Sequence, residues 1–315
     1  MLVDVIVPVY KPGKKFKRML TMLAAQSYPV HKVIVVNTER KYWNDEEFGQ
    51  IIDMEVHHIT KAEFDHGAAR HRAIEYSQAD VVICMTDDAV PADRRLVQKL
   101  TDALEWKGPR GETVIEAYAR QLPDKDCGYL EAYTRSFNYP DQSRIKTKAD
   151  LKELGIKTFF ASNVCCAYWR ELYLSQGGFI RRTIFNEDMI FAGKAIQAGY
   201  AVAYAADARV IHSHNYNCLQ QFRRNFDLAV SQADHPEVFG GIRSESEGIR
   251  LVRRSASYLV KKGRFYLLPD LVLKSGFKYL GYCLGKSYRH LPMKAVRLCT
   301  MNPGYWEKED MEERL

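Results

Sequence analysis

LVDVIVPVY, residues 2–10, is the stretch that decides the fold. Apolar side chains dominate it, which is typical of a strand buried on both faces of a sheet. Similar runs return at residues 32–37 (KVIVVN) and 80–85 (DVVICM), separated by helical patterns over residues 16–26 and 67–77. This alternation predicts an α/β domain with a parallel sheet and covering helices.

The second half of the chain returns to regular patterns after a loose segment. Residues 123–157 are polar and irregular, and a segment of this kind in a compact domain usually serves binding. Helical signals surround Trp169 and Arg170 and end at Gly177 and Gly178. The following patterns predict a helix, a strand and a helix at residues 186–199, 201–211 and 219–232.

Composition places the chain among folded cytoplasmic proteins. With 315 residues and 46% hydrophobic residues it is long enough to bury a core. It has no apolar stretch of about 18 residues, and Met1 leads directly into a strand, which predicts neither export nor membrane insertion. The seven cysteines include no CxxC pair, so we expect a reducing compartment and read Cys165 and Cys166 as packing residues.

The positive charge of the chain is concentrated near its C-terminus. The formal net charge is +7, yet between Arg250 and Thr300 twelve lysines and arginines stand against one acid, Asp270. Apolar residues interleave with them, which is typical of helices that lie on an anionic membrane. The alternative is a homodimer interface or a solvated helix. We therefore divide the chain into a catalytic domain at residues 1–240 and a basic amphipathic helical region at 241–315.

Polar residues follow three of the predicted strands. Tyr10, Asn37 and the run Thr86, Asp87, Asp88 stand where open α/β sheets bind their ligands. Two acids at the end of a buried strand are costly unless a cation or hydrogen bonds meet them, and Mg2+ or Mn2+ is held by few carboxylates together with substrate phosphates. The alternative is an ordinary turn.

Two further clusters carry groups suited to catalysis or metal binding. Glu187 and Asp188 open a helix, where acids also occur as ordinary caps. His212 and His214 follow a strand as alternate residues, so that both imidazoles can approach one point, although isolated histidines are more often structural. The glycine of FDHGAAR (64–70), Gly67, lies at a helix start suited to an anionic ligand.

Two nucleotide-binding motifs are excluded by their spacing. GYCLGKS, residues 281–287, has three residues between its glycines where a P-loop has four, and no buried strand precedes it. No GxGxxG follows the first strand, which argues against a dinucleotide oxidoreductase.

In chain order, several short motifs resemble the family 2 glycosyltransferases, and among them most closely the bacterial rhamnosyltransferases. The likeness covers roughly residues 2–235. The motifs are VPVY at 7–10, FDHGAAR at 64–70, TDDAVP at 86–91, GGF at 177–179, NEDM at 186–189 and HSH at 212–214. The resemblance implies a GT-A type, Rossmann-like mixed sheet with flanking helices, followed here by the basic helical extension.

The resemblance also implies roles for individual residues. Asp188 matches the catalytic base, with Glu187 beside it, and Asp88 matches the last acid of the metal motif, whose first position is here Thr86. His212 or His214 matches the histidine that completes the metal site. The donor would be bound by Pro8, Val9, Tyr10, Asn37, Asp65, Gly67, Arg70 and Asp87. Asn37 stands where many relatives have Asp.

The implied reaction is an inverting transfer that depends on Mg2+ or Mn2+. The donor would be a nucleotide-diphospho-sugar, with dTDP-L-rhamnose expected, and the acceptor a saccharide or lipid-linked saccharide at the inner face of the cell membrane, in cell-surface polysaccharide biosynthesis. QQFRR at 220–224 is similar to a signature of processive synthases, but Asn225 replaces its tryptophan. A sugar-nucleotide pyrophosphorylase is the enzymatic alternative. A basic nucleic-acid-binding protein would leave both acidic clusters unexplained, so we expect no nucleic-acid partner.

Overall fold

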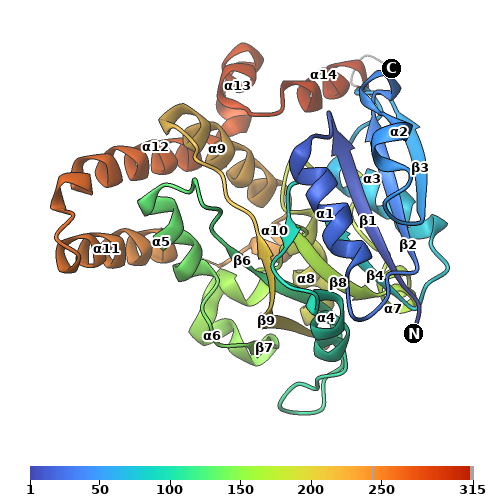
Figure 1. Cartoon of the computed structure of the whole chain (residues 1–315). Helices are drawn as coiled ribbons and strands as arrows, with labels where there is room; N and C mark the ends of the chain where they lie inside the picture. Colours follow the sequence, from blue (N-terminus) through green and yellow to red (C-terminus); the bar gives the residue numbers. More distant parts are fainter. Residues whose placement is uncertain (243–244, 313–315) are drawn as a thin grey trace. The chain divides into compact units, whose positions relative to one another are not determined.

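The computed structural model, which describes residues 1–242 and 245–312, contains a nine-stranded sheet (Figure 1). The strand order is β3-β2-β1-β4-β8-β6-β9-β5, and β7 pairs with β9. The strands are β1 Val3–Tyr10, β2 Lys32–Thr38, β3 Met54–Ile59, β4 Val81–Met85, β5 Val90–Pro91, β6 Val114–Leu122, β7 Arg144–Lys146, β8 Cys165–Trp169 and β9 Ala201–Ile211.

Helices cover the sheet and make up most of the last third of the described chain. They are α1 Lys14–Ala24, α2 Asp45–Phe48, α3 His66–Tyr76, α4 Leu96–Leu104, α5 Tyr129–Asn138, α6 Leu151–Leu154, α7 Arg170–Ser175, α8 Glu187–Gln197, α9 Cys218–Asp234, α10 Pro236–Phe239, α11 Glu245–Lys261, α12 Leu268–Lys286, α13 Met293–Cys299 and α14 Pro303–Glu312.

The sheet is parallel in its first half and mixed in its second. β2, β1 and β4 pair in parallel, as the alternation of strand and helix predicted. β3, which was not predicted, pairs in parallel with β2. β8 then lies antiparallel between β4 and β6, which makes the sheet mixed. The mixed sheet implied by the family resemblance is confirmed.

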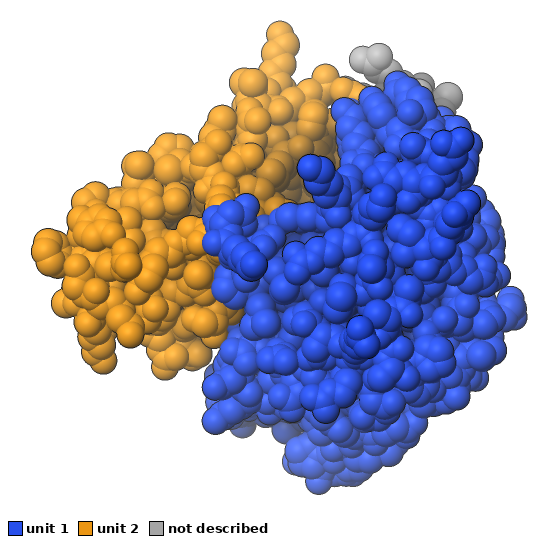
Figure 2. Space-filling view, in the orientation of Figure 1, with its two compact units in different colours: residues 1–126, 138–182, 187–213 blue, residues 127–137, 183–186, 214–315 orange. Residues whose placement is uncertain are grey.

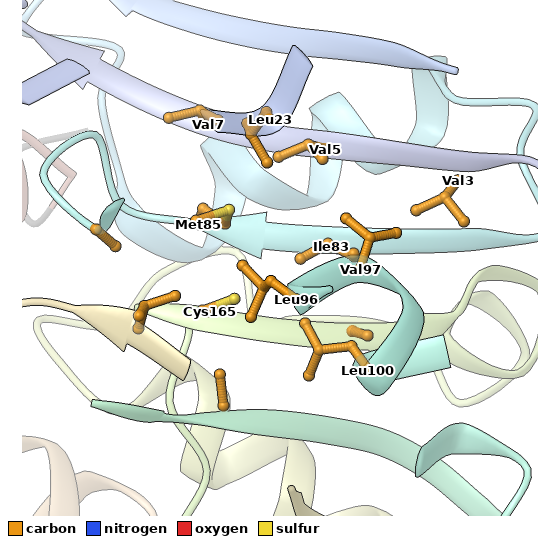
Figure 3. Close-up of a cluster of buried hydrophobic side chains, with 14 of the residues drawn as sticks. Val3, Val5, Val7, Leu23, Ile83, Met85, Leu96, Val97, Leu100 and Cys165 are labelled. Atoms are coloured by element: carbon orange, nitrogen blue, oxygen red, sulfur yellow. The ribbon is translucent and has the colours of Figure 1, made fainter. Parts of the chain in front are cut away.

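The core lies between one face of the sheet and two helices (Figure 3). Val3, Val5 and Val7 alternate along β1 and point to the same face, because successive side chains of a strand point to opposite sides. Leu23 of α1 and Leu100 of α4 pack against this face. These contacts pack β1 and β4 into the core, and the predicted site residues Tyr10, Asp87 and Asp88 lie at the carboxyl ends of these two strands.

Two sequence expectations about local structure need correction. Residues 123–157 contain α5, β7 and α6, where the sequence predicted an irregular segment. Trp169 ends β8, so the helix expected around it begins only at Arg170. Cys165 and Cys166 are buried and unpaired within the sheet, in keeping with their interpretation as packing residues.

The chain forms two compact units, coloured separately in Figure 2. The sheet unit comprises Met1–Asp126, Asn138–Arg182 and Glu187–Ser213, and contains every strand named above. The helical unit comprises Cys127–Phe137, Thr183–Asn186 and His214–Leu315. The division into domains at residues 240 and 241 stays a prediction, and residues 243–244 and 313–315 of the predicted tail lie outside the described residues.

Within the helical unit, α12 packs on α9 through two glycines. A Cβ on Gly281 would collide with the carbonyl oxygen of Phe222, and one on Gly285 with that of Phe226. The two glycines of GYCLGKS therefore allow α12 to approach the backbone of α9 closely. The position of this sequence within a helix agrees with its exclusion as a P-loop. Among the described residues, none of the helices combines the length and the hydropathy needed to cross a membrane.

Candidate active site

The carboxyl ends of β1 and β2 bring the first predicted residues together. Val9 lies opposite Asn37 in the parallel register, beside the half-buried Pro8. Asn37 is fully buried, donates from Nδ2 to the carbonyl of Glu39 at 3.2 Å, and lies 3.0 Å from Nδ1 of His58. The side chain of Val9 belongs to the core. The polar side chain at the carboxyl ends of β1 and β2 is therefore that of Asn37.

Tyr10 and Asp87 meet where β1 and β4 end. The ring of Tyr10 is 45% exposed and meets Tyr42 edge-on at 5.5 Å. Burial, together with the neighbouring carboxylate of Asp88, raises the pKa of Asp87 to about 6, while a hydrogen bond from the backbone of Tyr10 acts in the opposite direction. A half-buried acid with a raised pKa is commonly found at a ligand site.

Asp88 and the two histidines after β9 form a group with the geometry of a metal site. One ligand atom each from Asp88, His212 and His214 lies within 4.8 Å of the others. His212 is buried, and its Nε2 lies 3.4 Å from Oδ1 of Asp88. His214 follows two residues later along the chain, and its ring stacks on Tyr216 at 5.1 Å.

The hydrogen bonds around His212 orient its ring relative to Asp88. Gln121 donates from Nε2 to the hydroxyls of Tyr139 at 2.6 Å and Ser162 at 3.0 Å, so its Oε1 faces Nδ1 of His212 at 3.0 Å. Nδ1 therefore carries the proton in the neutral ring, and the lone pair of Nε2 faces the carboxylate of Asp88. Imidazole nitrogen and carboxylate oxygen are both groups that can bind a divalent cation, and Gln121 fixes the orientation of the imidazole.

A buried ion pair fixes the first of the two acids at the start of α8. Nη1 of Arg70, on α3, lies 3.1 Å from Oε1 of Glu187, and both residues are buried. Burial alone would raise the pKa of Glu187, but the charge of Arg70, with smaller contributions from His66 and Asn163, holds it below its ordinary value. Glu187 is therefore ionised at neutral pH.

Asp188 lies in a different environment although it is the next residue. Its Oδ2 accepts the backbone N–H of Asn163 at 2.9 Å, and its Oδ1 accepts that of Met189 at 2.8 Å. Burial nevertheless raises the pKa of Asp188 to about 7, and the charge of Glu187 acts in the same direction. A carboxyl group with this pKa can take up a proton near neutral pH.

Close packing brings the FDHG and GGF sequences to the same place. Asp65 caps α3 by accepting the backbone N–H of Ala68 at 2.8 Å. At Gly67 a Cβ would collide with the carbonyl oxygen of Ile180, so glycine is required for α3 to approach the segment before α8. This contact sets Arg70, one turn further along α3, beside Glu187.

Two residues that were not predicted orient these acids and histidines, Asn163 and Gln121. Asn163 donates from Nδ2 to Oε1 of Glu187 at 3.2 Å, while its own Oδ1 accepts the hydroxyl of Tyr168 at 2.8 Å. Gln121 orients His212 in a similar way. Neither amide stands in a charged or repeated pattern, and only their positions before β8 and at the end of β6 connect them with the site.

Two solved structures share the fold of this chain over most of their length. The mannosyltransferase PcManGT from Pyrobaculum calidifontis, solved with GDP-Man and Mn2+, superposes with a TM-score of 0.59 at 16% identity, covering 92% of this chain and 88% of that one. S. aureus TarS 1-349 in complex with UDP-GlcNAc gives a TM-score of 0.52 at 14% identity, covering 92% of each chain. The fold is therefore the GT-A fold predicted from the motifs.

Sequence comparison identifies the family. Residues 4–175 match the glycosyl transferase family 2 profile. The chain is similar to the O-antigen chain rhamnosyltransferase RfbN of Salmonella typhimurium, at 36% identity over 97% of this chain and 96% of the relative. It is also similar to the O-antigen chain rhamnosyltransferase WbaN of Salmonella anatum, at 38% identity over 79% and 78%. The chain belongs to glycosyl transferase family 2.

This membership makes the chain a glycosyltransferase, which confirms the predicted class of enzyme. It decides against the pyrophosphorylase alternative, because that reaction forms a nucleotide-sugar where a glycosyltransferase consumes one. The group of Asp88, His212 and His214 can accordingly be assigned as a candidate metal site of a transferase.

Proposed function

We propose that this chain transfers L-rhamnose from dTDP-L-rhamnose to a lipid-linked saccharide in the biosynthesis of a cell-surface polysaccharide. The observation that carries this proposal is the 36% identity with an O-antigen chain rhamnosyltransferase over nearly the whole of both chains. An identity of this level over full length supports a shared donor more strongly than a likeness of fold does, because one fold hosts many activities.

In this proposal Asp188 is the catalytic base. The acceptor hydroxyl gives its proton to Asp188 and attacks the anomeric carbon from the face opposite the leaving diphosphate, so that a β-linked donor yields an α-rhamnoside. The pKa of about 7 supports this role, since a base works best with a pKa near the operating pH. Glu187 stays ionised beside Arg70 and supports Asp188.

Asp88 and His212, with His214, would hold Mg2+ or Mn2+. A bound divalent cation supplies positive charge that offsets the charge growing on the departing diphosphate. The lone pair of His212 Nε2, directed by Gln121 toward Asp88, supports this assignment. Of the two histidines, His212 is the better-oriented ligand, because its ring is buried and held from the other nitrogen.

The donor nucleotide would lie at the carboxyl ends of β1 and β2. Pro8, Val9 and Tyr10 would border the base, with Asn37 as its hydrogen-bonding partner. Asp65, Gly67, Arg70 and Asp87 would lie near the diphosphate and sugar. The exposed ring of Tyr10 and the buried amide of Asn37 support this arrangement, because a flat base needs a stacking surface and a directed polar group.

The acceptor implies a location. A lipid-linked saccharide is held in a membrane, so we propose that the enzyme works in the cytoplasm as a peripheral protein at the inner face of the cell membrane. Residues 1–240 would then carry the catalytic function and residues 241–315 the attachment.

The test is a donor-binding screen followed by a transfer assay. Thermal shifts with dTDP-L-rhamnose, dTDP-glucose, UDP-glucose and GDP-mannose, each with Mn2+ or EDTA, should show the largest rise in Tm for dTDP-L-rhamnose with Mn2+. Asp188→Asn should keep that shift and lose transfer of labelled rhamnose to membrane lipids that carry saccharides. A larger shift with another nucleotide-sugar would overturn the choice of donor, and normal turnover by Asp188→Asn would overturn the role of the base.

A further inference from the structure

The exposed face of α12 is almost entirely apolar. Its exposed residues are Pro269, Val272, Leu273, Gly276, Tyr279, Leu280, Cys283, Leu284 and Lys286, and the one charged residue among these nine is Lys286, at the C-terminal end. The paired side chains of Asp270 and Lys274 are 40% and 32% exposed. Leu273 and Leu280 are 54% and 56% exposed, and Val272 is 67% exposed. Between Val272 and Leu284 these residues recur at helical spacing on one face of the helix. At a rise of about 1.5 Å per residue this face is about 18 Å long.

The opposite face of α12 already has its packing partner. Leu271, Gly281 and Gly285 are buried on that side, and the two glycines lie against the backbone of α9. Asp270, Lys274 and Lys278 recur every four residues along α12 and lie outside the exposed apolar set. The exposed residues are therefore more apolar than the remainder of the helix, and a contiguous apolar face of this kind indicates a partner that covers it.

Basic side chains stand at both ends of this apolar face. Lys261, Lys262 and Arg264 are exposed in the turn that joins α11 to α12, followed by Phe265 and Tyr266 with 67% and 61% exposure. Exposed Lys286 and Arg289 stand at the other end. Figure 1 shows α11 and α12 joined by this turn, and the two helices are in contact. The result is an apolar face bordered by cations and by two exposed aromatic rings.

Charge identifies the partner that this surface fits. A second copy of the chain would bring together two segments that each carry twelve basic residues and one acid between Arg250 and Thr300. An anionic lipid surface instead takes up basic side chains at the level of its headgroups and apolar ones just below, with aromatic rings at the boundary. The arrangement of charged, aromatic and aliphatic residues thus matches lipid better than another copy of this protein.

We propose that the apolar face of α12, with the basic and aromatic turn before it, is a membrane-binding surface that lies flat on anionic lipid. The proposal rests on the proposed function only in giving a lipid-linked acceptor a reason to be nearby. It specifies which side chains enter the lipid, Val272, Leu273, Tyr279, Leu280 and Leu284, and which contact the headgroups, Lys261 and Lys262.

The experiment is co-sedimentation of the full-length chain with vesicles. Vesicles of phosphatidylcholine with phosphatidylglycerol should bind the wild type, vesicles of phosphatidylcholine alone should bind it far more weakly, and added salt should reduce the difference. Leu273→Asp/Leu280→Asp should lower the partition coefficient at least about tenfold, because both aliphatic side chains lose their apolar contact. Lys261→Ala/Lys262→Ala should lower it about 25-fold on anionic vesicles, at about fivefold per basic side chain.

The matched control is Leu2→Asp/Leu219→Asp, which changes two leucines of 50% and 51% exposure that lie outside this surface. It should bind within about twofold of the wild type, since neither side chain meets lipid. Val272→Ser, a change without charge, supplies a second test if the double aspartate variant unfolds. Because the assay contains no nucleotide-sugar, its result is independent of the donor screen.

Three results would overturn the proposal. The wild type fails to bind anionic vesicles, or the control loses as much binding as Leu273→Asp/Leu280→Asp. Alternatively, sedimentation equilibrium reveals a dimer that Leu273→Asp/Leu280→Asp dissociates, in which case the face is an interface between two copies.

Discussion

Arg70→Met should destabilise the chain more than the double replacement Arg70→Met/Glu187→Met. The two side chains are only 5% and 10% exposed and form an ion pair at 3.1 Å. Removing one partner of a buried pair leaves a charge without its counterion and costs about 3–5 kcal/mol. Removing both replaces the pair by apolar side chains and leaves mainly the Asn163 amide without an acceptor, which costs about 1–3 kcal/mol.

The assay is urea unfolding of the wild type, both single variants and the double variant at pH 8. The coupling energy from this cycle should be at least about 2 kcal/mol, because each single variant carries a penalty that the double variant does not. The pKa of Glu187 is lowered in the folded state, so the stabilisation by the pair is complete above the unfolded pKa of about 4.3 and is lost as pH falls below it. Additive free energies at pH 8 would refute the reasoning.

Three further predictions concern the acid pair, the metal group and the packing of α3. Glu187→Gln removes a like charge beside Asp188, so the pKa of Asp188 should fall from about 7 and the acidic limb of kcat/KM should move to lower pH. Gln121→Leu removes the acceptor that orients His212 and should weaken Mn2+ binding about 10- to 100-fold, measured by electron paramagnetic resonance. Gly67→Ala forces a backbone collision and should cost about 1–3 kcal/mol, measured by urea unfolding.

Each of these three has an outcome that contradicts it. An acidic limb that stays in place in Glu187→Gln would show that Asp188 does not set it. Unchanged Mn2+ affinity in Gln121→Leu would remove the proposed support of the metal group. Gly13→Ala is the control for Gly67→Ala, because a Cβ on Gly13 meets nothing within 4 Å, and equal effects of the two would contradict the packing argument.

The sequence predicts β1, β2 and β4 well because each is an apolar run bounded by polar residues. β3 was not predicted, since its sequence MEVHHI contains a glutamate and two histidines and shows no such run. β8 was not recognised, since CCAYW is too short and too mixed to show a period, and its antiparallel direction depends on the path of the chain rather than on composition. The helix α5 was missed for another reason. Tyr129, Tyr133 and Phe137 do recur at helical spacing, but the helix is only ten residues long and stands within a polar stretch that was interpreted as irregular.

The acids and histidines of the candidate site were identifiable because clustered charged or imidazole groups are rare beside buried strands. The residues that orient these acids and histidines were not identifiable from the sequence. Gln121 and Asn163 each act through a single amide whose partner is distant in sequence. The same limit explains why the sequence left His212 and His214 equivalent. The structure distinguishes them, because Gln121 holds the ring of His212 whereas the ring of His214 stacks on Tyr216.

The hydrogen bonds of Asp188 argue against the interpretation of NEDM as an ordinary helix cap. A capping carboxylate accepts N–H groups two or three residues ahead and gains from the helix dipole, so its pKa falls. Asp188 instead accepts one N–H from the next residue and one from Asn163, far away in sequence, and its pKa rises to about 7. The pKa of Glu187, by contrast, is held below its ordinary value by the charge of Arg70. Neighbouring acids whose pKa values are driven apart are typical of an acid-base site, and here the separation makes Asp188 the one that can accept a proton.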